Sequence, residues 1–232
     1  MAGATIRAFL AVEVTDEVRQ EMRAVQDQFR QARPHVKWVE PELAHLTLKF
    51  LGLLDERQLA SVSRACQESA ARHLPFYLAF QGLGAFPNIR NVRMLWMGLG
   101  EGESEMAALA GDVQAAVEAL GFPAEDRAFQ PHLTLGRLKE PLNRVQMLYF
   151  NQLVEGYAAY PFGLMPVTAF QLLKSTLEPS GPVYDVLETY ALTGLDLPAP
   201  AEELPLPTAG EAEEAGAVDL DELPPGLAEG SG

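Results

Sequence analysis

Two four-residue motifs in this chain place a threonine two positions after a histidine. The first motif, His-Leu-Thr-Leu, begins at His45, and the same four residues return 87 positions later, beginning at His132. The chain holds only four histidines, so half of them stand in this repeated motif. Both motifs lie in leucine-rich stretches that favour β-strands. Side chains alternate between the two faces of a strand, so each histidine shares a face with its threonine, and the leucines point the other way.

A matched pair of such strands supplies acid–base chemistry at phosphorus. Two imidazoles with ordinary pKa values near 6.5 provide one base and one acid close to neutral pH. We expect one histidine to deprotonate water and the other to protonate the leaving oxygen. The hydroxyls of Thr47 and Thr134 are expected to hold the non-bridging oxygens. One such motif alone is more typical of a surface pair, but two copies at equivalent places favour a catalytic function.

No metal and no cofactor are expected at this site. The sequence has no cluster of carboxylates and no His/Cys spacing typical of a zinc site. The remaining histidines, His35 and His73, are expected in a loop and at a helix end, in contact with solvent.

The elements that must position the motifs follow a strand–helix–strand order that is run through about twice. The halves are therefore expected to form an α+β chain with an internal duplication around a cleft. A closing hairpin is predicted over 167–179 and 184–194. The other predicted strands cover 5–14, 36–40, 44–52, 76–86, 92–100 and 132–139, and the predicted helices cover 15–33, 55–73, 103–121 and 141–156.

Composition predicts one domain followed by a tail. Of the net charge of −15, residues 196–232 contribute ten carboxylates with no Lys or Arg, and they hold no aromatic residue. Such a segment buries too little apolar surface to offset its ordering entropy. We therefore expect a single bilobal domain over 1–195 and an acidic, proline-rich disordered tail over 196–232. The tail is either tolerated without a role or used to bind a partner or to mimic RNA.

Cysteine usage and hydropathy indicate the compartment. A single cysteine, Cys66, excludes an internal disulfide framework and fits a reducing, cytoplasmic environment. No run of about 18 apolar residues is present, so no membrane span is expected. We expect a monomer.

Two such motifs about ninety residues apart resemble the signature of the 2H phosphoesterase superfamily. The stretches "RAFLAVEV", "WVEPELAHLTLKFLG", "FPNIRNVRMLWMGL", "FQPHLTLGRLK" and "STLEPSGPVYDVLETYAL" are similar to the RNA 2′,3′-cyclic phosphodiesterases, long called 2′-5′ RNA ligases. The resemblance covers about residues 5–194. It implies a two-lobed, pseudo-symmetric fold with two antiparallel sheets lining a central cleft and helices on the outside.

The resemblance also implies roles for individual residues. His45 would be the proton donor and His132 the proton acceptor, while Thr47 and Thr134 would bind phosphate. Arg137 would contact phosphate, although strict alternation puts it on the leucine face, so a bulge near Gly136 is needed. Family members often have an arginine where this chain has Gln130. Two aromatic residues, Phe9 and Phe129, are candidates for stacking on a base, and two arginines, Arg90 and Arg93, for attracting the RNA backbone.

The function implied is metal-independent hydrolysis of RNA 2′,3′-cyclic phosphate ends to 2′-phosphates. Its partners would be RNA 3′ ends or small cyclic nucleotides. The alternatives are a 2′-5′ RNA ligase, a phosphodiesterase of small cyclic nucleotides, and a non-catalytic module that binds RNA ends. Loss of either histidine would indicate the last of these, and both are present.

Overall fold

The computed structural model describes residues 5–31, 35–125, 129–179 and 181–193. The expected tail over 196–232 lies outside the described residues. The helices are α1 (Asp16–Arg30), α2 (Glu56–Ala70), α3 (Glu103–Glu118) and α4 (Arg144–Gly156), and a short 3-10 helix, η1 (Pro41–Leu43), lies between strands β2 and β3. The strands are β1 (Ile6–Glu13), β2 (Val36–Trp38), β3 (His45–Leu54), β4 (Phe76–Asn88), β5 (Asn91–Leu99), β6 (Leu133–Leu138), β7 (Pro161–Val167), β8 (Ala169–Glu178) and β9 (Gly181–Ala191).

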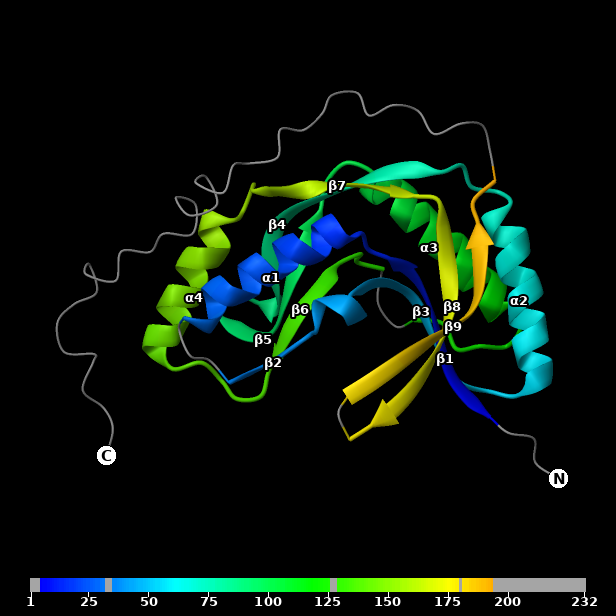
Figure 1. Cartoon of the computed structure of the whole chain (residues 1–232), viewed down its shortest axis with the longest axis horizontal. Coiled ribbons are helices and arrows are strands. Elements are labelled where there is room, and N and C mark those ends of the chain that lie inside the picture. The colour runs from blue at the N-terminus through cyan, green and yellow to red at the C-terminus, as the bar shows by residue number, and fades with distance from the viewer. Residues whose placement is uncertain (1–4, 32–34, 126–128, 180, 194–232) are drawn as a thin grey trace.

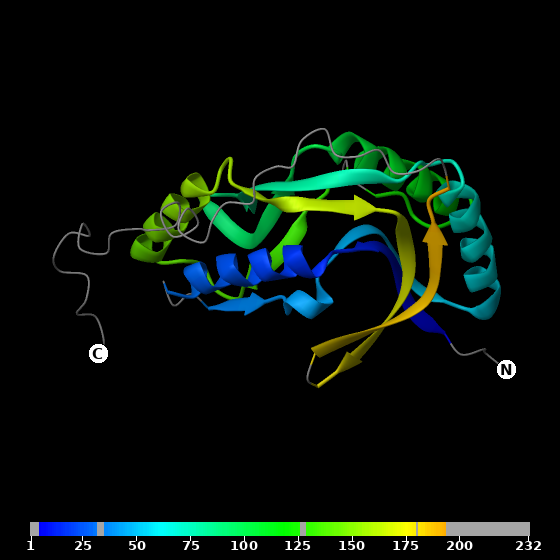
Figure 2. The same ribbon diagram turned by 45° about the horizontal axis from the view of Figure 1, so that its top comes forward.

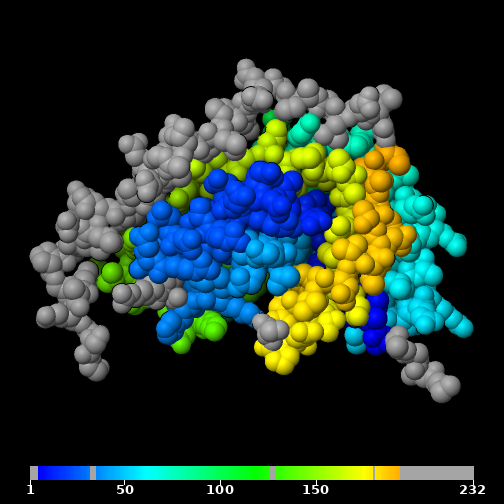
Figure 3. Space-filling view, viewed as in Figure 1, coloured from blue at the N-terminus to red at the C-terminus, as the bar shows by residue number. Residues whose placement is uncertain are grey.

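The strands form two antiparallel sheets, as predicted. Sheet A has the order β3-β1-β8-β9, and sheet B has the order β2-β6-β5-β4-β7. The first histidine motif therefore lies at an edge of sheet A, while the second lies inside sheet B. The hairpin of β8 and β9 projects from sheet A in both ribbon views (Figures 1 and 2). In the space-filling view this hairpin lies beside the segment that runs from α1 to η1 (Figure 3).

Two helices cross from the sheet that precedes them to the opposite one. Helix α1 follows β1 of sheet A, yet the amide of Gln26 donates to the carbonyl of Leu135 in sheet B at 3.0 Å. Helix α3 follows β5 of sheet B, yet the amide of Gln114 donates to the carbonyl of Leu48 in sheet A at 2.8 Å. As a result α1 lies with α4 over sheet B, and α3 lies with α2 beside sheet A (Figure 1). A continuous apolar core joins the two lobes.

Local signals account for some element boundaries. Asp55 caps α2, because its side chain accepts from the backbone N–H of Gln58 at 2.8 Å. Helix α4 begins at Arg144 and not at Pro141, because the side chain of Asn143 accepts from the N–H of Gln146 and sets the start. The closing hairpin is confirmed, although strand β7 was not predicted. Within the described part of the chain, no helix is both long and apolar enough to cross a membrane.

Candidate active site

The motif residues face as the strand alternation predicts. His45 and Thr47 are half-buried on β3, and His132 stands directly before β6, which carries Thr134. The four leucines of the motifs are buried in the core: Leu46, Leu48, Leu133 and Leu135. Apolar packing of the leucines therefore fixes which way the polar residues point.

His45 and His132 each make a hydrogen bond of the same kind, from the imidazole to a backbone carbonyl two residues earlier. Nδ1 of His45 lies 2.8 Å from the carbonyl oxygen of Leu43, and Nδ1 of His132 lies 2.7 Å from that of Gln130. A carbonyl oxygen only accepts, so Nδ1 must carry the hydrogen in each ring. Nε2 of each imidazole is then left to take or give a proton. Because the bond uses the backbone of Gln130, it does not depend on the amide that replaces the expected arginine.

Burial lowers the pKa of both histidines. It lowers the pKa of His45 below the ordinary value of 6.5, against the smaller opposing effect of the Leu43 carbonyl. It also lowers the pKa of His132, where the Gln130 carbonyl opposes the shift and the positive charge of Arg137 adds to it. Both rings are therefore mainly neutral at pH 7 in the free protein. One of them must gain a proton for acid catalysis.

Aromatic rings surround His45. The ring centroid of Phe9 lies 4.8 Å from that of the imidazole, and Tyr184 of β9 meets the imidazole edge-on at 5.3 Å. Phe9 is only 3% exposed, so it packs against His45 and Tyr184. We therefore regard Phe9 as a support for His45, since a base would have to displace these rings to stack on it.

His132 also contacts two aromatic rings. Phe86 of β4 meets the imidazole edge-on at 5.1 Å, and Trp96 of β5 lies 6.2 Å away. Sequence reasoning assigned no role to Phe86, Trp96 or Tyr184. Trp96 follows the buried Leu95 on the same strand, so the two side chains point to opposite faces of the sheet. This alternation could have indicated that Trp96 faces the cavity.

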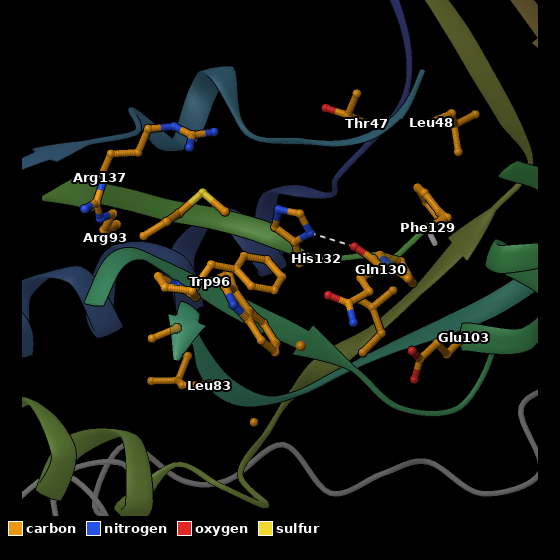
Figure 4. A pocket seen from close by; sticks show the side chains of 18 of the residues that line it. Thr47, Leu48, Leu83, Arg93, Trp96, Glu103, Phe129, Gln130, His132 and Arg137 are labelled. Carbon is orange, nitrogen blue, oxygen red and sulfur yellow. Dashed lines mark hydrogen bonds between the residues drawn. The ribbon is translucent and has the colours of Figure 1, made fainter. Parts of the chain in front are cut away.

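A cavity of about 1440 Å³ lies between the sheets. Thr47 of sheet A and His132, Phe129 and Arg137 from the sheet B side line it (Figure 4). His45 is not among its lining residues, although Thr47 on the same face of β3 is. Thr134 also does not line it.

The hydroxyl of Thr134 has a weak partner inside the protein. It donates to the sulfur of Met94 at 3.7 Å, and Met94 itself lines the cavity. A sulfur acceptor is weak, so an anionic oxygen would compete for this hydroxyl readily. The threonine therefore stands one side chain away from the cavity.

A bulge in β6 turns Arg137 toward the cavity. Leu95 pairs with Gly136, whereas Trp96 pairs with Thr134, so Leu135 is an extra residue in the ladder. This shift reverses the alternation beyond Leu135 and puts Arg137 among the cavity residues. The bulge that Arg137 was predicted to need is present.

Charge is unequal along the cavity. Arg93 and Arg137 lie on one side of His132, while Glu103 lies on the other side (Figure 4). Arg90 does not line the cavity. An anion is therefore favoured on the arginine side of His132.

Each of the two remaining histidines lies beside a carboxylate. His35 lies 3.1 Å from Glu140 at the surface. His73 was expected in solvent, but its side chain is 16% exposed and lies 3.0 Å from Asp112. Among residues 5–31, 35–125, 129–179 and 181–193, no group of three or more His, Cys, Asp or Glu is arranged to hold a metal ion.

Comparison with known families agrees with the duplicated motif. The family described as LigT-like phosphoesterase matches this chain over two segments, residues 12–96 and 99–184. Each segment contains one His-Leu-Thr-Leu motif. The two matches agree with the internal duplication inferred from the order of elements.

Similar proteins cover most of the chain. The RNA 2′,3′-cyclic phosphodiesterase of Methanothermobacter thermautotrophicus is 34% identical over 187 residues, which is 81% of this chain and 99% of the relative. That of Archaeoglobus fulgidus is 37% identical over 185 residues, 80% of this chain and 99% of the relative. The crystal structure of TT0787 of Thermus thermophilus superposes with a TM-score of 0.65 at 34% identity, covering 81% of this chain and 98% of that one. The chain thus belongs to the family of LigT-like phosphoesterases, within the 2H phosphoesterases that its paired motifs indicated.

Proposed function

We propose that this protein hydrolyses the 2′,3′-cyclic phosphate at the 3′ end of RNA to a 2′-phosphate, without a metal ion. The observation that carries the proposal is the matched hydrogen bond at Nδ1 of His45 and His132, which leaves two Nε2 nitrogens for proton transfer. The RNA 2′,3′-cyclic phosphodiesterase names of the relatives support the substrate class.

In the proposed reaction, His132 is the base and His45 is the acid. Nε2 of His132 takes a proton from water as the water oxygen bonds to phosphorus. The bond between phosphorus and the 3′ oxygen breaks, and protonated His45 gives its Nε2 proton to that oxygen. The products are a 3′-hydroxyl and a 2′-phosphate. Afterwards the proton on His132 must return to solvent and His45 must be reprotonated.

The polar residues around the histidines are proposed to hold the phosphate. The hydroxyls of Thr47 and Thr134 donate to the non-bridging oxygens, and the guanidinium of Arg137 offsets their charge. Phe129, which lines the cavity, is kept as a candidate for stacking on a base. Arg93, on the same side of His132 as Arg137, is proposed to attract the RNA backbone.

The decisive experiment uses a 5′-labelled oligonucleotide that ends in a 2′,3′-cyclic phosphate. Incubation with the protein in the presence of EDTA should give a terminal 2′-phosphate, identified by ³¹P NMR and mass spectrometry. The protein with His45→Gln and His132→Gln together, purified in parallel, should give no product. A 3′-phosphate product, or activity only after a divalent ion is added, would contradict the proposal.

The same reaction mixture separates the alternatives. Adding an oligonucleotide with a free 5′-hydroxyl tests ligation, because that hydroxyl can attack phosphorus in place of water while the same bond to the 3′ oxygen breaks, which gives a 2′-5′ linkage. A small cyclic nucleotide as sole substrate tests whether the RNA chain contributes to binding. Tight binding without turnover would identify a module that binds RNA ends.

A further inference from the structure

The indole of Trp96 is pressed against the backbone of the neighbouring strand. Trp96 of β5 pairs with Gly84 of β4. A Cβ atom at Gly84 would lie 2.2 Å from the indole Cζ2, so any other residue there would collide with the ring. At Gly98 a Cβ would lie 2.7 Å from the carbonyl oxygen of Gln81 and 3.3 Å from Cζ3 of the same ring. Glycine at these positions makes room for a large flat ring, which itself lines the cavity.

Packing alone does not explain why this ring is a tryptophan. The Nε1–H of Trp96 is buried and has no hydrogen-bond partner within the described part of the chain. A buried donor without a partner lowers stability, and a phenylalanine would avoid that donor, although it would fill less space. The wide indole surface that lines the cavity is therefore available for a use besides packing.

The position of Trp96 relates it to the reacting phosphate. Across β5 and β6 it pairs with Thr134, the proposed phosphate ligand, and its ring centroid lies 6.2 Å from that of His132. In a 2′,3′-cyclic phosphate, phosphorus and the terminal base are attached to the same ribose. The base must therefore lie within one sugar of the phosphate, which is the distance scale between cross-strand neighbours.

We propose that Trp96 is the platform on which the terminal nucleobase of the substrate stacks. The inference rests on the proposed function, since it names the part of the substrate that this cavity wall recognises. Phe86, whose ring lies 5.2 Å from the indole, extends the aromatic wall. Stacking uses the π-face that every base has, so the site accepts all four bases. It binds the larger purines more tightly than the pyrimidines.

Kinetics with a deleted base provide the test. One oligonucleotide ends in adenosine 2′,3′-cyclic phosphate, and a second carries the same cyclic phosphate on a terminal ribose without a base. For the unmodified protein the KM of the second should exceed that of the first by roughly 5- to 150-fold, the range for loss of one stacked base. The ratio should fall to about one in Trp96→Leu and take an intermediate value in Trp96→Phe. Trp38→Phe changes the chain's other tryptophan and should keep the full ratio.

A Trp96→Leu protein that keeps the full ratio of KM values would overturn the inference. If Phe129→Leu lost the ratio in the same series, the base would stack on Phe129 instead. If the unmodified protein hydrolysed neither substrate, the proposed function would fail, and fluorescence would still test the platform.

Fluorescence gives this second, non-catalytic readout. In the Trp38→Phe protein, Trp96 is the one remaining tryptophan. Adenosine 2′-phosphate should quench its emission in a saturable way, whereas ribose 2-phosphate should not. No quenching by the nucleotide, or equal quenching by both compounds, would contradict a base stacked on Trp96.

Discussion

His45 and His132 make the same contact in the two halves of the chain, each with Nδ1 bonded to the carbonyl oxygen two residues earlier. The bond selects one tautomer and one ring orientation for each imidazole. Because the partners are backbone atoms of Leu43 in η1 and of Gln130 just before β6, they move only if the backbone there moves. The site therefore holds two matched proton carriers on two separate sheets.

Replacing either histidine with glutamine should remove nearly all turnover. Glutamine keeps a hydrogen-bond donor in the side chain, but it neither accepts nor gives a proton in the needed pKa range. Loss of a general acid or base corresponds to about 10²–10⁴-fold in kcat, and the double variant should lose little more than either single one. Steady-state rates, with circular dichroism as the control for folding, check this. Activity within a few-fold of the parent would remove that histidine from the mechanism.

Thr47→Val and Thr134→Val should each slow the reaction less severely. Valine has nearly the same shape as threonine but cannot donate to an anionic oxygen. A lost charge-assisted hydrogen bond of about 1.5–3 kcal/mol corresponds to roughly 10–150-fold in kcat/KM. The matched Thr→Ser variants keep the hydroxyl and should retain most activity. If valine and serine gave equal rates, the hydroxyls would have no contact with the phosphate.

The pH dependence of kcat/KM should be a bell centred below 6.5. Burial lowers the pKa of both His45 and His132, so the state with one neutral and one protonated ring is most populated at acidic pH. A bound phosphate anion favours the protonated rings, so the kcat profile should lie at higher pH than the kcat/KM profile. Initial rates over pH 4–9 at low and saturating substrate measure both. A kcat/KM optimum clearly above 6.5 would contradict the burial effect.

The same shifts affect stability. The folded protein binds these protons less readily than the unfolded chain, so stability is full above pH 6.5. It should decrease as the pH falls through the lowered folded pKa values. Urea unfolding of the parent and of the double glutamine variant should differ in this window.

Arg137→Met should weaken substrate binding and also move a pH limb. Loss of one charge-assisted contact to phosphate should raise KM by roughly 10–150-fold. Arg137 also lowers the pKa of His132, so its removal should shift the limb that belongs to His132 toward higher pH. Arg90→Met removes an exposed charge that does not line the cavity and should do neither. A raised KM with no shift in the part of the pH profile that reports His132 would mean that the guanidinium does not lie close to His132.

Lys49→Met should destabilise the fold. The ammonium of Lys49 is buried on β3, donates to the carbonyl of Pro123 at 2.7 Å and lies 3.1 Å from Glu125. Methionine fills similar volume but leaves the carbonyl without its partner, which should cost about 1–3 kcal/mol. Urea unfolding at pH 7 measures the loss. An unchanged free energy of unfolding would mean that the desolvation of the lysine balances its bonds.

Short-range patterns in the sequence determined much of this protein. The motif that begins at His45 and at His132 can be read directly from the sequence. The alternation that buries its leucines follows from the two-residue period of each strand. The start of α2 follows from Asp55, because capping is decided within one turn. Strand β7 was not predicted. It is an edge strand of sheet B that pairs with β4, and this pairing joins segments that are far apart in the sequence.

Tertiary structure alone decided how the cavity wall is made. The extra residue at Leu135 turns Arg137 inward because the register of β6 against β5 shifts there. The spacing of residues does not reveal such a shift, and a bulge was expected only because the resemblance placed Arg137 at the phosphate. Phe9 is buried partly because Tyr184 of β9, which is distant in the sequence, packs against it. Trp96 lies flat because the residue opposite it in β4 is Gly84. Each of these depends on which strands meet and in which register, and packing of the whole core sets that choice.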